Sequence, residues 1–227
     1  MRSGKAAMLE TPLKEILSAS EILPEAFYAR AAIEVARDCL GKILVHGETA
    51  GRIVEVEAYL GVDDLAAHAS RGITGRTRVL FGPPGRAYVY LIYGMHECLN
   101  FVAEPEGQAG CVLIRALEPV SGLEKMTERR PKAKGVEVLA AGPGRLTSAL
   151  GITRELNGSS LVEGALLVRR MRVEEPIEIE VTPRVGISKC VDWPLRFAIA
   201  GNPFVSRLVI PFRRCKSTNG TKLKKNR

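Results

Sequence analysis

The spacing of apolar residues along the chain predicts few helices and many strands. Apolar residues recur at helical spacing after Pro24, which suits a first helical turn, and the pattern stops at Gly41, so we expect one helix over about 24–41. The residues 121–124 have the form of a capping box that opens a second helix, and a short helical pattern follows over 145–150. Alternating or continuous apolar runs predict strands over residues 42–46, 52–60, 87–92, 97–103, 112–117, 165–173, 177–182, 196–200 and 204–211.

Three stretches fall outside these elements. Residues 61–87 form an irregular connection rich in Gly, Arg and Thr, and a connection of that length within a compact domain is usually functional. Residues 1–20 are expected to be a flexible polar lead-in, and the basic residues 213–227 a disordered tail. No repeat or linker interrupts residues 21–212, so we expect one compact mixed α/β domain, richer in strands than in helices.

Composition narrows the range of functions. The 227 residues include 33 lysines and arginines against 25 acidic residues, a net charge of +8, which favours a polyanion or an anionic membrane as partner. A hydrophobic content of 46% excludes a mostly disordered chain, and no apolar run has the length of a transmembrane helix or a secretory signal. The five cysteines form no C-x-x-C pair and the three histidines have no metal-ligand spacing, so we expect reduced thiols, a cytosolic compartment and no metal.

Two carboxylates alternate along the predicted strand over 52–60. Strand geometry places Glu55, Glu57 and Tyr59 on one face with Ile53, and apolar residues on the other. Solvated side chains are the commoner explanation of such an alternation. Acidic residues at the centre of a basic protein would repel a phosphate backbone, however, so a binding role alone does not account for them. A carboxylate held near a nucleic acid could activate a water as a general base.

Three of the five tyrosines lie within six residues, at positions 88, 90 and 93. Tyr88 and Tyr90 share one face of a strand, and Tyr93 begins the other face or the following turn. Core aromatics of a β-hairpin are one explanation. The other is a stacking pocket for a nucleobase with a wedge at the hairpin tip, because phenol rings stack well and keep a polar end.

Three single residues lie in unusual surroundings. His68 stands in the irregular segment, where it is either structural or a hydrogen-bond partner of a base or phosphate. Asn100 interrupts an apolar strand, either to satisfy the backbone or to discriminate a base edge. Arg115 has apolar neighbours and needs a carboxylate or phosphate partner, for which Glu57 is one candidate.

Basic residues add further candidates for contact with an anion. The segment 142–145, Gly-Pro-Gly-Arg, opens a helix and could bind a phosphate with backbone N–H groups and one cation, although it lacks the P-loop pattern. Arg71, Arg76 and Arg78 bring positive charge to the irregular segment, where a solvated charged loop is the default explanation.

Nine stretches carry a resemblance to a known family; in chain order they are residues 51–61, 66–68, 81–85, 87–95, 98–100, 111–119, 142–146, 184–187 and 193–197. Together they resemble the mammalian-type alkyladenine (3-methyladenine) DNA glycosylases over about residues 23–212, and we expect a bacterial member. The resemblance implies a mixed α/β (α+β) fold in a single compact domain, with a curved, mostly antiparallel β-sheet, surrounding helices and a protruding β-hairpin. His96, Glu97 and residues 73–75 depart from the family pattern, which affects the expected loop shapes and minor-groove contacts.

The resemblance implies roles at the reacting bond and around the base. Glu57 matches the general base that activates the water attacking C1′ of the sugar, and Arg115 matches an arginine near that water. Tyr59 and Tyr90 match the aromatics that stack on the flipped base, and Asn100 matches a residue that excludes guanine by a clash with its amino group. The base-binding positions are therefore Tyr59, His68, Tyr90 and Asn100.

The resemblance also implies contacts with the rest of the DNA. Tyr93 and Met95 match the hairpin tip that intercalates through the minor groove, and Arg76 and Arg145 match basic contacts to phosphates. No lysine stands among the matched active-site positions, so we expect a water nucleophile and no strand cleavage.

The implied function is that of a monofunctional DNA glycosylase. It would excise alkylated or deaminated purines, of the 3-methyladenine, 7-methylguanine and hypoxanthine class, from double-stranded DNA by base flipping, as the first step of base excision repair. We expect a monomer in the cytoplasm, associated with the nucleoid, with no cofactor and no membrane. Two alternatives stay open: a basic nucleic-acid-binding module in which Glu57 is structural, and a formyl-transfer domain, for which no formyl-donor site is visible.

Overall fold

The computed structural model describes residues 10–206. Its helices are α1 Leu13–Ala19, α2 Glu25–Tyr28, α3 Ala32–Cys39, α4 Leu123–Arg129 and α5 Pro143–Leu150, with 3-10 turns η1 His68–Arg71, η2 Arg78–Phe81, η3 Val136–Val138 and η4 Arg154–Leu156. Its strands are β1 Ser20–Ile22, β2 Ile43–His46, β3 Thr49–Tyr59, β4 Ala87–Ile92, β5 His96–Ala103, β6 Gly110–Ser121, β7 Leu166–Met171, β8 Ile179–Thr182 and β9 Arg196–Ile199. The predicted α+β class is confirmed.

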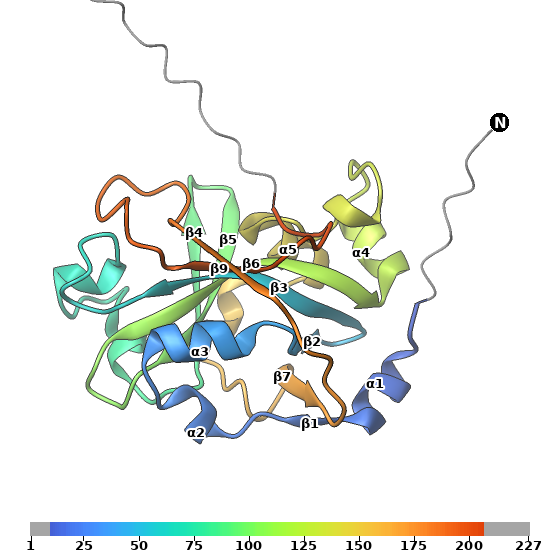
Figure 1. Cartoon of the computed structure of the whole chain (residues 1–227), viewed down its shortest axis with the longest axis horizontal. Helices are drawn as coiled ribbons and strands as arrows, with labels where there is room; N and C mark the ends of the chain where they lie inside the picture. The colour runs from blue at the N-terminus through green and yellow to red at the C-terminus, as the bar shows by residue number, and fades with distance from the viewer. Residues whose placement is uncertain (1–9, 207–227) are drawn as a thin grey trace, which may run out of the picture.

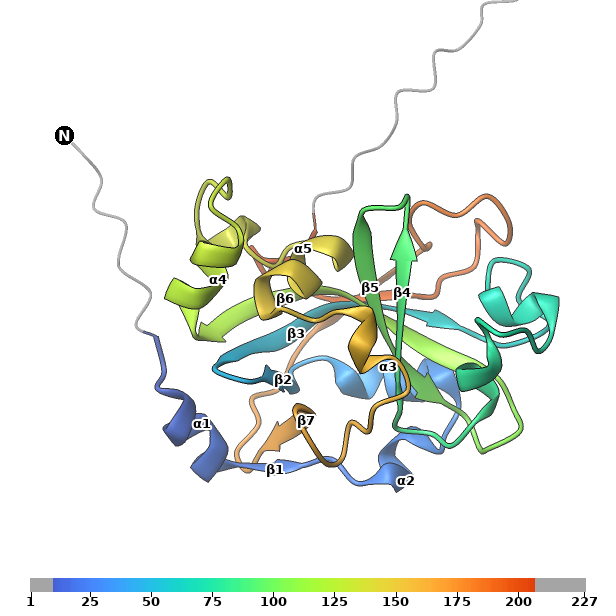
Figure 2. The same ribbon diagram turned by 180° about the vertical axis from the view of Figure 1, so that it is seen from behind.

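A single antiparallel sheet organises the molecule (Figure 1). Its main path runs β1-β7-β2-β3-β6-β5-β4, and β9 adds to β3 and carries β8. The long strand β3 therefore has β6 along one edge, while β2 and then β9 pair with successive parts of the other edge. Helix α3 covers one face and α5 the opposite face, as the two views show (Figures 1 and 2). The centre of the sheet is thus sealed on both sides.

Strand β3 has no solvent-exposed face over residues 53–58. Every residue from Ile53 to Ala58 is buried, and β-bulge irregularities interrupt its pairing with β6 around Glu55. The explanation of Glu55 and Glu57 as solvated side chains is therefore wrong: both are 0% exposed. Polar residues on a strand covered by both layers must find partners inside the protein.

The predicted helix over 24–41 is two helices. The predicted helix breaks between α2 and α3, where Ala31 leaves the helical conformation with a φ of −51° and a ψ of 132°. A carboxylate oxygen of Glu104 accepts the Ala32 N–H at 2.7 Å, and the Glu104 N–H donates to the Arg30 carbonyl. This tertiary contact satisfies the backbone groups of the break, which helical spacing alone cannot reveal.

The predicted capping box before α4 is also wrong. Strand β6 continues to Ser121, and Gly122 takes the N-cap position with a left-handed φ of 76°. The carboxylate of Glu10 accepts the N–H groups of Gly122 and Leu123 instead. The cap comes from a distant segment, and Gly122 supplies a backbone conformation that favours glycine.

The N-terminal boundary of the domain differs from the prediction. Residues 10–20 belong to the fold rather than to a flexible lead-in: Ile16 in α1 is buried, and Arg169 of β7 donates to Ser20. Of the strand predicted over 204–211, residues 204–206 are not a strand, and the rest lies outside the described residues, as do residues 1–9 and the tail 213–227.

Candidate active site

Strand β3 places the carboxylate of Glu57 directly behind the lining of a pocket. One Glu57 oxygen accepts the Val185 N–H at 2.7 Å and lies 3.2 Å from Nη1 of Arg115. The other oxygen accepts the Tyr59 hydroxyl at 3.0 Å. Arg115 thus meets the partner proposed for it from sequence. Burial raises the pKa of Glu57, and the charge of Arg115 with the two hydrogen bonds only partly offsets that rise.

A second carboxylate lies deeper, in what we name the inner cluster: Glu55, Arg115, Arg196 and Ser206. Oε1 of Glu55 accepts Nε of Arg115 at 2.8 Å, Nε of Arg196 at 2.7 Å and the Ser206 hydroxyl at 2.9 Å. Oε2 accepts the Ser206 N–H at 2.7 Å. Burial alone would raise the pKa of Glu55, but these partners together hold it below its usual value. Sequence reasoning assigned no role to Glu55, Arg196 or Ser206; an arginine inside an apolar strand was the available signal for Arg196.

The pocket has a volume of about 680 Å³ and lies between β4, β5 and the segment 185–189. Tyr59, His68, Tyr90, Asn100 and Arg115 all line it, together with the hairpin residue Tyr93. The structure therefore brings the four predicted base-binding residues and Arg115 into one cavity. Glu57 does not line the cavity; it lies directly behind, bonded to three residues that do.

Residues of β4 and η1 add an aromatic cluster to the pocket lining. The rings of His68 and Tyr90 meet edge to face at 4.6 Å between centroids, and Tyr88 and Tyr90 lie 5.3 Å apart. Nδ1 of His68 lies 2.9 Å from the Tyr88 hydroxyl. Burial, and then the charges of Arg76 and Arg71, lower the pKa of His68 to about 4. His68 is therefore a neutral imidazole near pH 7.

Asn100 is held rigidly at the pocket surface. It is 3% exposed, its amide N–H donates to the Tyr88 carbonyl at 3.1 Å, and its oxygen lies 3.8 Å from the Cys111 sulfur. The backbone contact considered from sequence is thus present, and it fixes the amide next to the cavity. Whether that amide discriminates bases stays a prediction.

The tip of the β4–β5 hairpin projects away from the sheet (Figure 2). Tyr93 is 83% exposed and Met95 71% exposed, and Tyr93 has a left-handed φ of 53°. Exposed apolar side chains on a strained turn are available for contact with a partner. The predicted protruding hairpin is confirmed, and intercalation by its tip stays a prediction.

The two predicted phosphate-binding arginines are exposed but differ in surroundings. The guanidinium of Arg76 lies 4.8 Å over the Tyr90 ring, and its Nε donates to the Tyr88 hydroxyl at 3.2 Å. Arg145, in the first turn of α5, donates to the Ala141 carbonyl at 3.2 Å. Phosphate contacts by either residue stay predictions.

A buried ion pair behind Tyr59 escaped the sequence reasoning. Arg184 is bonded to Asp64 through both terminal nitrogens, and its guanidinium lies 4.6 Å over the Tyr59 ring. Both side chains of the pair are fully buried. Residues 184–187 matched the family motif, but nothing local indicated a partner 120 positions away. The pair anchors the start of the segment that supplies the Val185 N–H to Glu57.

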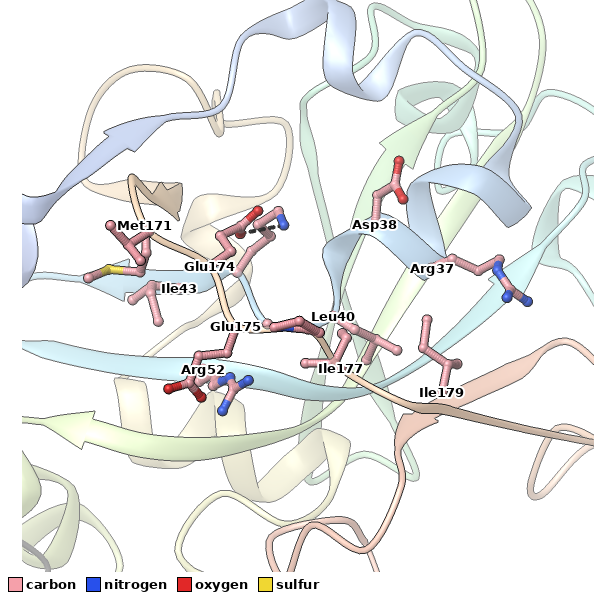
Figure 3. A pocket seen from close by; sticks show the side chains of 14 residues that line it. Arg37, Asp38, Leu40, Ile43, Arg52, Met171, Glu174, Glu175, Ile177 and Ile179 are labelled. Carbon is pink, nitrogen blue, oxygen red and sulfur yellow. Dashed lines mark hydrogen bonds and ion pairs between the residues drawn. The ribbon is translucent and has the colours of Figure 1, made fainter.

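A second cavity, of about 510 Å³, lies between the end of α3 and residues 171–179 (Figure 3). Two of its charged lining residues, Lys42 and Glu174, pair at 2.6 Å. It contains no tyrosine or histidine. Within residues 10–206 no group of three or more His, Cys, Asp or Glu side chains could hold a metal ion, and no helix has the length and apolar character needed to cross a membrane.

The arrangement combines a buried carboxylate behind an aromatic pocket with an exposed hairpin tip on a basic chain, features suited to an enzyme that acts on nucleic acid. The chain belongs to the methylpurine-DNA glycosylase family, whose match spans residues 26–203.

Curated relatives agree with this assignment. A protein of Methanoculleus marisnigri is 55% identical over 191 residues, covering 82% of this chain and 98% of the relative. One of Koribacter versatilis is 49% identical, covering 81% and 92%, and one of Methanocella arvoryzae is 48% identical, covering 82% and 96%. Each carries the name "Putative 3-methyladenine DNA glycosylase". The chain is therefore a DNA glycosylase, a DNA-binding hydrolase of DNA repair, and the binding-module and formyl-transfer alternatives are excluded.

Proposed function

We propose that this enzyme flips alkylated or deaminated purines out of double-stranded DNA into the pocket and cleaves their glycosidic bond with water, Glu57 acting as general base. The observation that carries the proposal is the position of Glu57: a buried carboxylate with a raised pKa, directly behind a pocket walled by Tyr59, His68 and Tyr90. The substrates would be of the 3-methyladenine, 7-methylguanine and hypoxanthine class. A monomeric state and a cytoplasmic, nucleoid-associated location remain predictions.

The carboxylate supports this chemistry in two ways. An ionised Glu57 next to the sugar would stabilise the positive charge that develops as the bond to the base breaks, and it would take a proton from the attacking water. Arg115, shared between Glu57 and Glu55, keeps the carboxylate oriented. Glu57 is 0% exposed, so a water must enter from the pocket beside its three partners to reach the carboxylate; one of these partners, the Val185 N–H, lies in a segment without helix or strand.

The aromatic walls support base binding. A purine between Tyr59 and Tyr90 would gain stacking energy of about 1–3 kcal/mol per contact, comparable to the cost of unstacking it from the duplex. The exposed tip at Tyr93 and Met95 would fill the gap left in the helix.

Base release from duplex DNA carrying one hypoxanthine, and from methylated DNA, tests the proposal. Wild type should release both bases in single-turnover reactions, and Glu57→Gln should lose about 10²- to 10⁴-fold in rate while still binding DNA. Glu174→Gln, in the second cavity, serves as the matched control and should keep the wild-type rate. Release by Glu57→Gln at the wild-type rate would disprove the role of Glu57.

Borohydride reduction of the same reactions tests the water nucleophile. Lys189 lines the pocket rim and is exposed, although sequence reasoning placed no lysine at the site. A water mechanism forms no covalent adduct between protein and DNA. An adduct that disappears in Lys189→Gln would instead show a Schiff base and strand cleavage.

A further inference from the structure

Arg76, Tyr88 and His68 form a hydrogen-bonded row, in which Tyr88 and His68 line the pocket and Arg76 lies behind Tyr88, outside the lining. The Nε–H of Arg76 donates to the Tyr88 hydroxyl oxygen at 3.2 Å, and the same oxygen lies 2.9 Å from Nδ1 of His68. Tyr88 is 2% exposed, so its hydroxyl group has to find its partners within the protein.

The direction of these bonds follows from what each group can donate. A guanidinium has donors and no acceptor, so the Tyr88 oxygen must accept from Arg76. The hydroxyl proton is then left to donate, and Nδ1 of His68 is the acceptor within reach. If Nδ1 carried the proton instead, the phenol oxygen would face two donors and the buried hydroxyl proton would have no acceptor among the described residues, which is costly.

A neutral imidazole with an unprotonated Nδ1 carries its proton on Nε2. Nε2 has no hydrogen-bond partner among the described residues and is not sealed from solvent, and His68 lines the pocket. The low pKa of His68, about 4, caused by burial and by Arg76 and Arg71, keeps the ring neutral at neutral pH.

We propose that Arg76 is a positioning residue: through the Tyr88 hydroxyl it holds His68 in the Nε2–H tautomer, so that the pocket presents one hydrogen-bond donor to the flipped nucleotide. The inference rests on the proposed function for its consequence, because the donor matters only if a nucleotide enters. Its partner would be an acceptor, a carbonyl oxygen or an unprotonated ring nitrogen, whereas an amino group at the same place would be refused.

Nitrogen NMR of the DNA-free protein labelled at histidine tests the tautomer directly. The chain has three histidines, so His68 is assigned by loss of its signals in His68→Gln. In wild type at pH 7, Nδ1 should resonate as an unprotonated ring nitrogen and Nε2 as a protonated one. Arg76→Met should move both signals toward the average of two tautomers, and Tyr88→Phe should do the same, while Arg76→Lys should retain most of the wild-type pattern.

Arg78→Met is the matched control, since Arg78 is an exposed arginine two positions along the same segment, and it should leave the His68 signals unchanged. A wild-type His68 protonated at Nδ1, or signals that do not move in Arg76→Met and Tyr88→Phe, would overturn the proposal.

Kinetics then separate this inference from the proposed function. Arg76→Met and Tyr88→Phe should each slow hypoxanthine release by about 5- to 10-fold, the range of one hydrogen bond, and the double variant should be little slower than either. Additive losses in the double variant would contradict a shared route through His68. Absence of base release by wild type would refute the proposed function while leaving the tautomer measurement intact.

Discussion

Two carboxylates on one strand, two residues apart and both fully buried, lie in opposite electrostatic surroundings. In the inner cluster, Glu55 accepts hydrogen bonds from two arginines, Arg115 and Arg196, and from Ser206, and its pKa is lowered. At the pocket, Glu57 has only a share of Arg115 and two neutral donors, and its pKa is raised. Burial acts on both, so the number of cationic partners decides the direction.

Under the proposed function, the difference separates a structural charge, Glu55, from the general base, Glu57. Glu55 is ionised because the fold surrounds it with cations, and it therefore contributes stability at neutral pH. Glu57 is left with its negative charge less fully compensated, which costs stability but keeps a base able to take up a proton. A carboxylate as well compensated as Glu55 would be a poor proton acceptor.

Removing the arginine that joins the two carboxylates should have the largest effect on folding. Arg115→Met leaves Glu55 with one cation and Glu57 with none, both buried, so we expect a loss of about 3–5 kcal/mol in the free energy of unfolding. Urea denaturation followed by circular dichroism measures it. An exposed arginine, Arg78→Met, is the control; equal midpoints for the two variants would show that the shared arginine does not hold the two regions together.

Replacing Glu55 by glutamine should disrupt the inner cluster, because the cluster offers only donors to this side chain. Oε1 of Glu55 faces two arginines and a hydroxyl, and Oε2 faces the Ser206 N–H, so the amide nitrogen of glutamine would oppose a donor on either side. We expect Glu55→Gln to lose about 1–3 kcal/mol at pH 7. The folded pKa is depressed, so this stability is present above the unfolded pKa and is lost as pH falls through the folded pKa.

Unfolding measured across acid pH checks that sign. The gap between wild type and Glu55→Gln should be widest near neutral pH and should close as the pH falls below the usual range of a glutamate. A gap that stays constant over this range would mean that the loss comes from packing and not from the charge.

Replacing Glu57 by its amide should change the free energy of unfolding in the opposite direction, and by less. Glutamine fits there, because its oxygen can keep the Val185 N–H and Arg115 while its nitrogen donates to the Tyr59 hydroxyl. The folded pKa is raised, so ionisation of Glu57 opposes folding above the unfolded pKa, and that cost vanishes as the pH falls below it. We expect Glu57→Gln to gain about 0.5–2 kcal/mol at pH 7. A clear loss of stability in Glu57→Gln would contradict the conclusion that the two buried carboxylates have opposite effects on stability.

The surroundings of Glu57 were easier to predict from sequence than the surroundings of Glu55. The strands around Glu57, the tyrosine pair and the exposed tip follow from local alternation, and the family motifs named the same residues. The partners of Glu55 come from residues 115, 196 and 206, and Arg184 pairs with a residue 120 positions away, so no local pattern could join them. The predictions of an unbroken helix at Ala31 and of a local cap before α4 failed for the same reason. Each feature depends on a hydrogen bond to a distant residue, Glu104 or Glu10.

The smallest change in the free energy of unfolding is expected at a charged pair that is partly exposed to solvent. In the second cavity Glu174 is 40% exposed and pairs with Lys42 at 2.6 Å, a shorter contact than any between Arg115 and its carboxylates (Figure 3). Solvent screening and side-chain entropy nevertheless limit such a pair to about 0–1 kcal/mol. Urea denaturation of Glu174→Gln at low and at high salt should therefore differ from wild type by less than about 1 kcal/mol, and the difference should shrink with salt. A loss as large as that of Glu55→Gln would mean that contact distance, and not burial, sets the strength of charge pairs in this protein.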